Sequence, residues 1–153
     1  VKDLGEVESE GQVPHITIEY SANVADHHDI DALVEVVHQA ALDHGLASLD
    51  ALRTRAAERE HYRIADGQPD HAFIALAARI GPGRDLEART SFLEQVLFAA
   101  VHRIESADSP LAIAWSAELT EIDPETRINR NRVRARLQAQ GVAALHDTGE
   151  IAP

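Results

Sequence analysis

The residues of this chain that could carry out chemistry are a few arginines and the side chains near one proline. Several arginines focused in one pocket could hold a small anionic substrate against the field of an acidic protein, and this 153-residue chain has a net charge of −12. Pro14 opens a stretch of alternating apolar and polar residues, and proline suits the first residue of a strand because it has no N–H for the ladder. The candidates, in chain order, are Pro14, His15, Glu19, Arg53, Arg55 and Arg84.

Other chemistries are excluded by what the sequence lacks. It has no cysteine, which removes disulfides, zinc–thiolate sites and thiol nucleophiles. Its nine histidines show no metal-binding spacing, and the adjacent His27 and His28 point in different directions, so we predict no metal site. The sequence has neither a glycine-rich phosphate loop followed by a lysine-bearing helix nor a serine nucleophile elbow.

The charge and hydropathy patterns also bear on partners and location. Nucleic-acid binding needs a basic face, so we expect no nucleic-acid partner for the fold as a whole. No apolar run is long enough to cross a bilayer, and we expect no membrane partner. Residues 1–13 carry four acids and one lysine without the apolar segment of a signal peptide. We interpret them as a flexible extension and expect a cytoplasmic protein.

Apolar periodicity predicts two similar halves, each with a strand, a helix and a second strand. The second strand of the first half places Arg53 and Arg55 on one face and apolar residues on the other. Asp29 and Asp85 can cap the starts of the two helices, and Gly45 suits the position just after the first. The predicted strands cover about 15–21, 51–57, 71–80 and 111–119, and the predicted helices cover about 29–44 and 85–106.

The two halves, about 14–60 and 70–122, form an internal repeat with a period of about 57 residues. A strand–helix–strand unit crosses over right-handed and makes a parallel pair. Two such units side by side predict an α+β (α/β) fold, a four-stranded mixed sheet with two helices on one face. The third strand is almost wholly apolar, so we expect it to be buried on both faces. The bare face of the sheet would then pack against other subunits.

The segment after the last strand is rich in arginine. Residues 127–136 hold five of the 14 basic residues, without interleaved aromatic residues. A nucleic-acid arm is one interpretation, but we favour an arm or short helix that pairs with acids of a neighbouring subunit. Residues 138–153 are predicted to be a frayed C-terminal tail.

Four stretches of the chain carry a further pattern. They are PHITIEYSAN from Pro14, LRTR at 52–55, ADGQPDHAF at 65–73 and IGPGRDLEAR at 80–89. In this order and spacing they resemble the 5-carboxymethyl-2-hydroxymuconate isomerase family of the tautomerase superfamily. The Ala-Asp-Gly-Gln loop together with the Gly-x-Gly-Arg turn is the most specific part. The resemblance implies a tautomerase domain over residues 14–137.

The resemblance also implies how such a protein works. It implies a homotrimer without metal or organic cofactor, acting on a small enol or keto carboxylate of the muconate type from aromatic (homoprotocatechuate) catabolism. Pro14 would be the mature N-terminus, and its secondary amine would move a proton between two carbons. Arg53 matches the family's substrate-polarising arginine and Arg84 matches an arginine of the second unit's turn, so both would bind substrate. His15, Glu19 and Arg55 are weaker candidates for the pocket.

The chain departs from the family pattern at Pro14, which here follows Val13. An amide nitrogen has no basic lone pair, so the chain as written should be nearly inactive as a tautomerase. Three explanations stay open. The start of the sequence could be misassigned, which we favour, because Val13 fits a valine-type start codon that would be read as methionine and removed before Pro14. Alternatively, a peptidase could trim the extension, or the protein could be a catalytically silent trimer. A partner-binding domain that uses residues 125–140 is a further alternative.

Overall fold

The structure is a computed structural model that describes residues 14–141. The predicted extension of residues 1–13, and residues 142–153 of the predicted tail, lie outside the described residues. No helix within the described part of the chain is long and apolar enough to cross a membrane.

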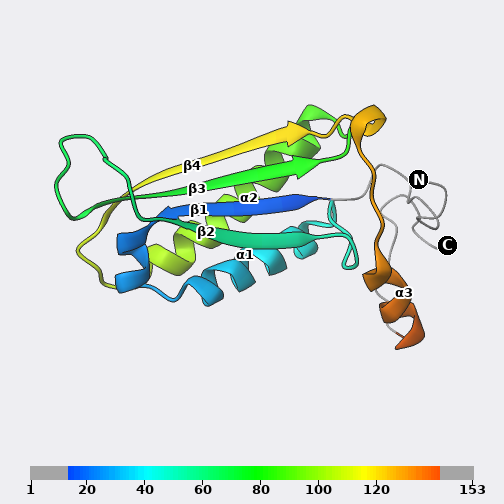
Figure 1. Ribbon diagram of the computed structural model, residues 1–153, viewed down its shortest axis with the longest axis horizontal. Coiled ribbons are helices and arrows are strands. Elements are labelled where there is room, and N and C mark those ends of the chain that lie inside the picture. Colours follow the sequence, from blue (N-terminus) through cyan, green and yellow to red (C-terminus); the bar gives the residue numbers. More distant parts are fainter. Residues whose placement is uncertain (1–13, 142–153) are drawn as a thin grey trace.

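A four-stranded mixed sheet forms the centre of the molecule, with the strand order β2-β1-β3-β4 (Figure 1). β1 pairs in parallel with β2, β3 pairs in parallel with β4, and the antiparallel pairing of β1 with β3 joins the two halves. This arrangement confirms the predicted sheet. The strands are β1 (His15–Ser21), β2 (Arg53–Arg59), β3 (His71–Ile80) and β4 (Ala112–Glu121).

Two helices, α1 (Ile30–His44) and α2 (Leu86–Glu105), cover one face of the sheet, as predicted (Figure 1). The carboxylates of Asp29 and Asp85 accept hydrogen bonds from the backbone N–H groups three residues later, at 3.1 and 2.7 Å. Each cap satisfies an N–H that has no partner within the helix. Gly45 ends α1 with a φ of 91°, a left-handed conformation that glycine adopts without a Cβ penalty.

The two halves repeat closely in space. β1 and β3 begin 56 residues apart, and so do the N-caps of α1 and α2. Each half therefore begins its helix with an aspartate cap, although a 3-10 helix, η1 (Ala22–Asp26), precedes the cap in the first half only. The second strands differ more, because β2 begins with arginines and β4 with small residues.

The core lies between the sheet and the helices. Ile16, Ile18 and Ile74 of the central strands and Phe92 of α2 are fully buried there. The other face of the sheet is open. Along β3 every second side chain is only half-buried or exposed within the single chain, so the prediction that this strand is buried on both faces is wrong for one chain. Burial of the second face would require other subunits.

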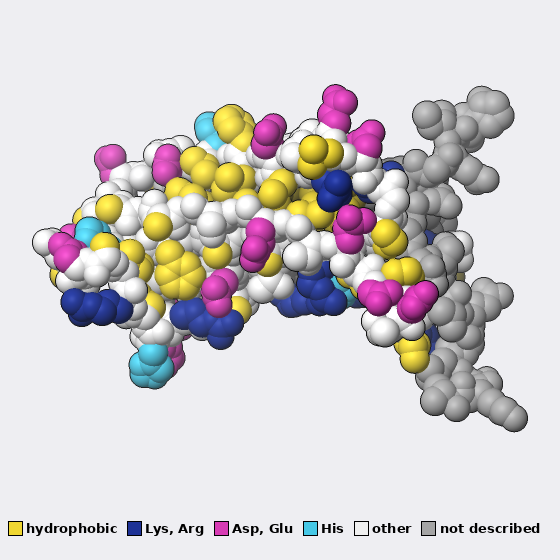
Figure 2. All heavy atoms as spheres, turned by 90° about the horizontal axis from the view of Figure 1, so that it is seen from above, with side chains coloured by type: hydrophobic (Ala, Val, Ile, Leu, Met, Phe, Trp, Pro, Cys, Tyr) yellow, Lys and Arg dark blue, Asp and Glu magenta, His cyan; other side chains and the backbone are white. Residues whose placement is uncertain are grey.

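The edge strand β4 is also incompletely covered. Its helix-facing side chains are half-buried, and its other face is exposed. A hollow between α2 and β4 is lined by Leu93, Leu97 and Trp115, and hydrophobic side chains gather among acidic ones on the side of the molecule shown in Figure 2. After β4 the chain forms a short 3-10 turn, η2 (Pro124–Thr126), and a short helix, α3 (Arg132–Ala139).

Two phenylalanines on α2 provide a matched test of this core. Phe92 is fully buried, whereas Phe98 is 72% exposed. We expect Phe92→Ala to lower the free energy of unfolding by about 3–5 kcal/mol, because it removes buried apolar area and leaves a cavity. Phe98→Ala should change it by less than about 0.5 kcal/mol. Urea unfolding followed by circular dichroism measures both, and equal effects would contradict the described packing.

Candidate active site

Three predicted site residues are brought to one end of the sheet by its topology. Since β1 runs antiparallel to β3, the start of β1 lies beside the end of β3. The start of β2 lies beside the start of β1, on the side away from β3. Pro14 therefore lies at the same end as Arg53, the first residue of β2, and as the turn that carries Arg84. This end is opposite to the long loop between β2 and β3 (Figure 1).

Pro14 and Arg53 are in direct backbone contact. The Arg53 N–H donates to the Pro14 carbonyl oxygen at 3.2 Å, and the Pro14 side chain is fully buried. The Arg53 side chain is half-buried, and its Nη2 donates to Asn129 Oδ1 at 3.5 Å. Its Nη1 is buried without a hydrogen-bond partner among the described residues. A buried guanidinium nitrogen without a partner is costly, so a ligand oxygen there would be favoured.

Arg84 lies on the helix side of the same end. It is half-buried in the turn that follows β3. Its charge contributes, after burial, to lowering the pKa of His44 at the end of α1. The structure thus brings Pro14 and Arg53 together. Arg53 lies on the open face of the sheet, whereas Arg84 lies near the helices that cover the other face.

His15 stands among arginines on the open face. Across the sheet its Cα pairs with that of Arg53 on one side and that of Arg79 on the other. The guanidinium Nη1 of Arg55 donates to His15 Nδ1 at 3.2 Å. Burial lowers the pKa of His15 to about 4, and so do the charges of Arg53, Arg55, Arg79 and Arg127. His15 is therefore neutral near pH 7.

Arg79 and Arg127 were not identified from the sequence as neighbours of this site. A signal was available for Arg79, because it is the one charged side chain inside the otherwise apolar run of β3, apart from the histidine that begins it. No local pattern could show that Arg127, in the segment after β4, lies near His15. Glu19 lies away from this end, since it is four residues along β1 and pairs with Arg59 at 2.7 Å.

The arginine-rich segment folds back onto its own chain. Asn131 donates to the backbone oxygen of Asp50 at 2.7 Å, and Arg134 Nε pairs with the buried carboxylate of Asp50. The prediction that this segment pairs with acids of a neighbouring subunit is therefore wrong for Arg134. The predicted short helix is present as α3, whose start Asn131 caps by accepting from the Val133 N–H at 2.9 Å. Together with Asn129, these contacts hold the segment against the start of β2.

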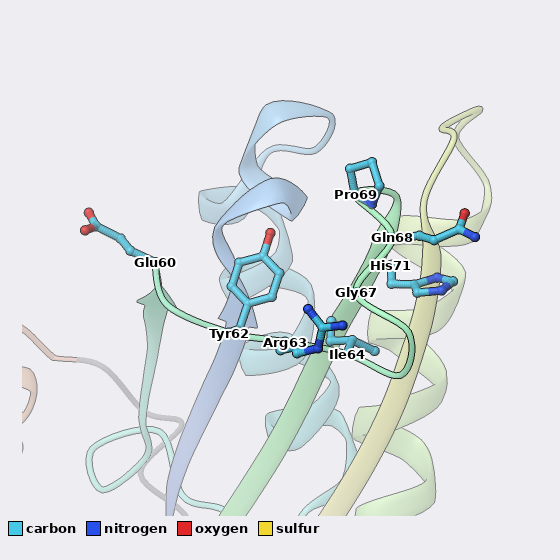
Figure 3. Close-up of a pocket in the computed structure, with 8 residues that line it drawn as sticks. All are labelled: Glu60, Tyr62, Arg63, Ile64, Gly67, Gln68, Pro69 and His71. Carbon is cyan, nitrogen blue, oxygen red and sulfur yellow. The ribbon is translucent and has the colours of Figure 1, made fainter.

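A separate pocket of about 290 Å³ lies at the opposite end, in the loop between β2 and β3 (Figure 3). Asp66 organises this loop by accepting hydrogen bonds from the Gln68 N–H and from His71 Nε2, at 3.2 and 2.8 Å. Gly67, with a φ of 82°, lets the Arg63 guanidinium approach so closely that a Cβ there would lie 2.5 Å from it. The Ala-Asp-Gly-Gln signature therefore shapes a loop far from Pro14 in the same chain. No group of histidine, aspartate or glutamate side chains within residues 14–141 is arranged to hold a metal ion.

Comparisons with known proteins identify the family and the fold of this chain. The profile of the 5-carboxymethyl-2-hydroxymuconate isomerase family matches residues 14–137. The 5-carboxymethyl-2-hydroxymuconate Delta-isomerase of Escherichia coli is 28% identical over 123 residues, which cover 80% of this chain and 98% of that protein. The crystal structure of a 5-carboxymethyl-2-hydroxymuconate isomerase from Deinococcus radiodurans R1 has a TM-score of 0.74 at 24% identity, covering 83% and 96% of the two chains.

A more distant structural relative is described as the W0 fused 4-OT wild type symmetric trimer. Its TM-score is 0.54 at 19% identity, and the match covers 74% of this chain and 91% of that one. At this identity the likeness concerns the fold alone.

The ion pair between Arg134 and Asp50 can be tested against a second arginine of α3. Arg134→Gln leaves a carboxylate with 1% exposure without its charged partner, so we expect a loss of about 1–3 kcal/mol in the free energy of unfolding. Arg136→Gln, at an exposed position of the same helix, should cost less than about 0.5 kcal/mol. Urea unfolding measures both, and an unaffected Arg134→Gln variant would show that the segment is not anchored at Asp50.

The titration of His15 reports on its burial and on the charges of the arginines around it. Because the folded protein disfavours imidazolium, its pKa lies below the ordinary value, and protonation as the pH falls from 6.5 toward about 4 should reduce stability. We expect the His15 imidazole signals in NMR spectra to titrate near pH 4, and Arg79→Gln to raise that midpoint. Arg59→Gln, where the arginine already pairs with Glu19, is the control. A midpoint near 6.5 in the unaltered protein would contradict the arrangement.

Proposed function

Because the chain belongs to the 5-carboxymethyl-2-hydroxymuconate isomerase family, and is thus an isomerase of the tautomerase superfamily, we propose that it isomerises a carboxylated enol acid of the muconate type. The observation that supports the site is the pairing of Pro14 with Arg53 at one end of the sheet, where the Arg53 Nη1 is buried without a partner among the described residues. Arg84, in the turn at the same end, is the second substrate-binding arginine of this proposal.

The proposed mechanism is a proton transfer by the Pro14 amine. An N-terminal amine ordinarily has a pKa of about 7.7–8.0, and burial beside a positive charge would lower it further. Such an amine is a base near neutral pH, where general acid–base catalysis is most effective. It would remove a proton from one carbon of the dienol and return it to another. Arg53 would bind a carboxylate and stabilise the negative charge that develops on the enolate oxygen.

The mechanism needs a chain whose first residue is Pro14. In the printed sequence the nitrogen of Pro14 is part of an amide with Val13 and cannot accept a proton. Removal of residues 1–13 by any route would create the required secondary amine. The catalytically silent alternative is favoured by this amide and by the complete burial of the Pro14 ring.

The assembly that we propose is a homotrimer. The open face of the sheet presents small and apolar residues, including exposed Ala112 and Ala114 and half-buried Phe73 and Ala75. A face of this kind on an otherwise charged protein favours contact with further subunits. The related fused 4-OT structure is itself a symmetric trimer. The cytoplasmic location stays a prediction.

The decisive experiment compares the full chain with a chain that begins at Pro14, using 2-hydroxymuconate as the substrate and ultraviolet absorbance to follow its isomerisation. We expect activity in the shortened chain alone. Pro14→Ala should lower kcat/KM by about 10²–10⁴-fold, the range of a general acid–base group. Arg53→Gln should lower it by at least about tenfold, whereas Arg59→Gln on the same strand should not.

Both chains must be checked for folding and oligomeric state by circular dichroism and analytical ultracentrifugation. A shortened chain that folds and forms a trimer, but does not isomerise the dienol, would contradict the enzymatic proposal for this substrate class and support the catalytically silent alternative.

A further inference from the structure

Three basic side chains on the open face of the sheet occupy neighbouring positions around His15. Arg53, His15 and Arg79 are consecutive partners across β2, β1 and β3, so their side chains share one face. Adjacent strands are about 4.8 Å apart, which puts the Cα atoms of Arg53 and Arg79 about 10 Å from one another. Arg55 lies two residues along β2 on the same face and reaches back to the His15 ring. We call His15, Arg55 and Arg79 the open-face cluster.

Within residues 14–141, carboxylates form ion pairs with other cations and not with the open-face cluster. Other arginines are paired: Arg59 with Glu19, Arg89 with Glu121 and Arg134 with Asp50. Among residues 14–141 no ion pair joins a carboxylate to the cluster arginines or to Arg53. Three guanidinium groups this close, without a carboxylate partner among the described residues, repel one another, and an anion placed among them would be strongly favoured.

The state of the His15 ring adds a neutral donor to this cluster. A guanidinium can only donate, so the hydrogen bond from Arg55 requires His15 Nδ1 to be the acceptor. In a neutral imidazole the remaining proton then lies on Nε2. The lowered pKa of His15 keeps the ring in this state near neutral pH. The cluster therefore offers two guanidinium forks and one imidazole N–H on the same face.

We propose that His15, Arg55 and Arg79 form a second carboxylate-binding subsite beside Arg53, which selects substrates with two or more carboxylates. The inference rests on the proposed function for its link to the reaction. Arg53 would hold the carboxylate next to the reacting carbons, and the open-face cluster would hold a carboxylate at a distance from them. Arg55 and Arg79 then determine specificity, and His15 positions Arg55.

The first test measures binding alone and does not depend on activity. Muconate and sorbate are six-carbon dienes that differ in having two carboxylates and one. NMR titration of the full chain follows the His15 imidazole signals with each compound. We expect muconate to shift them with a Kd at least tenfold lower than that of sorbate. Arg79→Gln should remove most of this difference, whereas Arg59→Gln, on the same face but paired with Glu19, should retain it.

The second test uses the chain that begins at Pro14. The ratio of kcat/KM for 2-hydroxymuconate to that for the single-carboxylate enol of phenylpyruvate should fall about tenfold or more in Arg79→Gln and in Arg55→Gln. An active enzyme whose ratio is unchanged in these variants would overturn the subsite and leave the proposed function intact. Inactivity on both substrates with selective muconate binding would overturn the proposed function and retain the subsite.

The cluster could also meet carboxylates of another copy of the chain. In that case muconate would not shift the His15 signals, and Arg79→Gln would weaken the oligomer in sedimentation experiments. That combination of results would overturn the proposal.

Discussion

The antiparallel pairing of β1 with β3 is the constraint on which the arrangement of this molecule depends. Parallel pairing within each strand–helix–strand unit keeps the starts of its two strands at one end. The antiparallel seam places the start of β1 beside the end of β3. Pro14, Arg53 and the turn with Arg84 therefore meet at one end, although they come from segments up to 70 residues apart. A parallel seam would separate Arg84 from Pro14 by the length of the sheet.

The same seam explains why positive charge collects in an acidic protein. It places Arg79, the last charged position of β3, one strand away from His15 and two from Arg53. Glu19, Glu121 and Asp50 pair with arginines outside this group, namely Arg59, Arg89 and Arg134. Burial of His15 first, and then the field of the arginines around it, lowers the pKa of the ring and keeps it neutral. The same field makes an unoccupied cluster unfavourable. An anion is the simplest chemical complement of such a surface, and the proposed enol-acid substrates are anions.

Much of the fold follows from local patterns in the sequence, and much of the site does not. Alternation and 3.6-residue periodicity predicted the four strands and two main helices, and Asp29, Asp85 and Gly45 marked helix ends that the structure confirms. The predicted start of β2 was two residues too early, because Leu52 continues the apolar alternation of the strand. Arg127 and the Asp50–Arg134 pair escaped prediction because they join segments distant in sequence, and a charge pattern alone does not show which acid faces which arginine.

The C-terminal segment connects these features at Arg53. Asp50, three residues before Arg53, is the anchor for Asn131 and Arg134, while Asn129 contacts the Arg53 guanidinium itself. A long side chain at the start of an edge strand would otherwise have many rotamers to lose on binding a ligand. Contacts on both the backbone and the guanidinium restrict that freedom before a ligand arrives, which lowers the entropic cost of binding. The segment therefore orients Arg53 beside Pro14. The charge of Arg127, in the same segment, also lowers the pKa of His15, so the segment contributes to the charge of the face on which a substrate would lie.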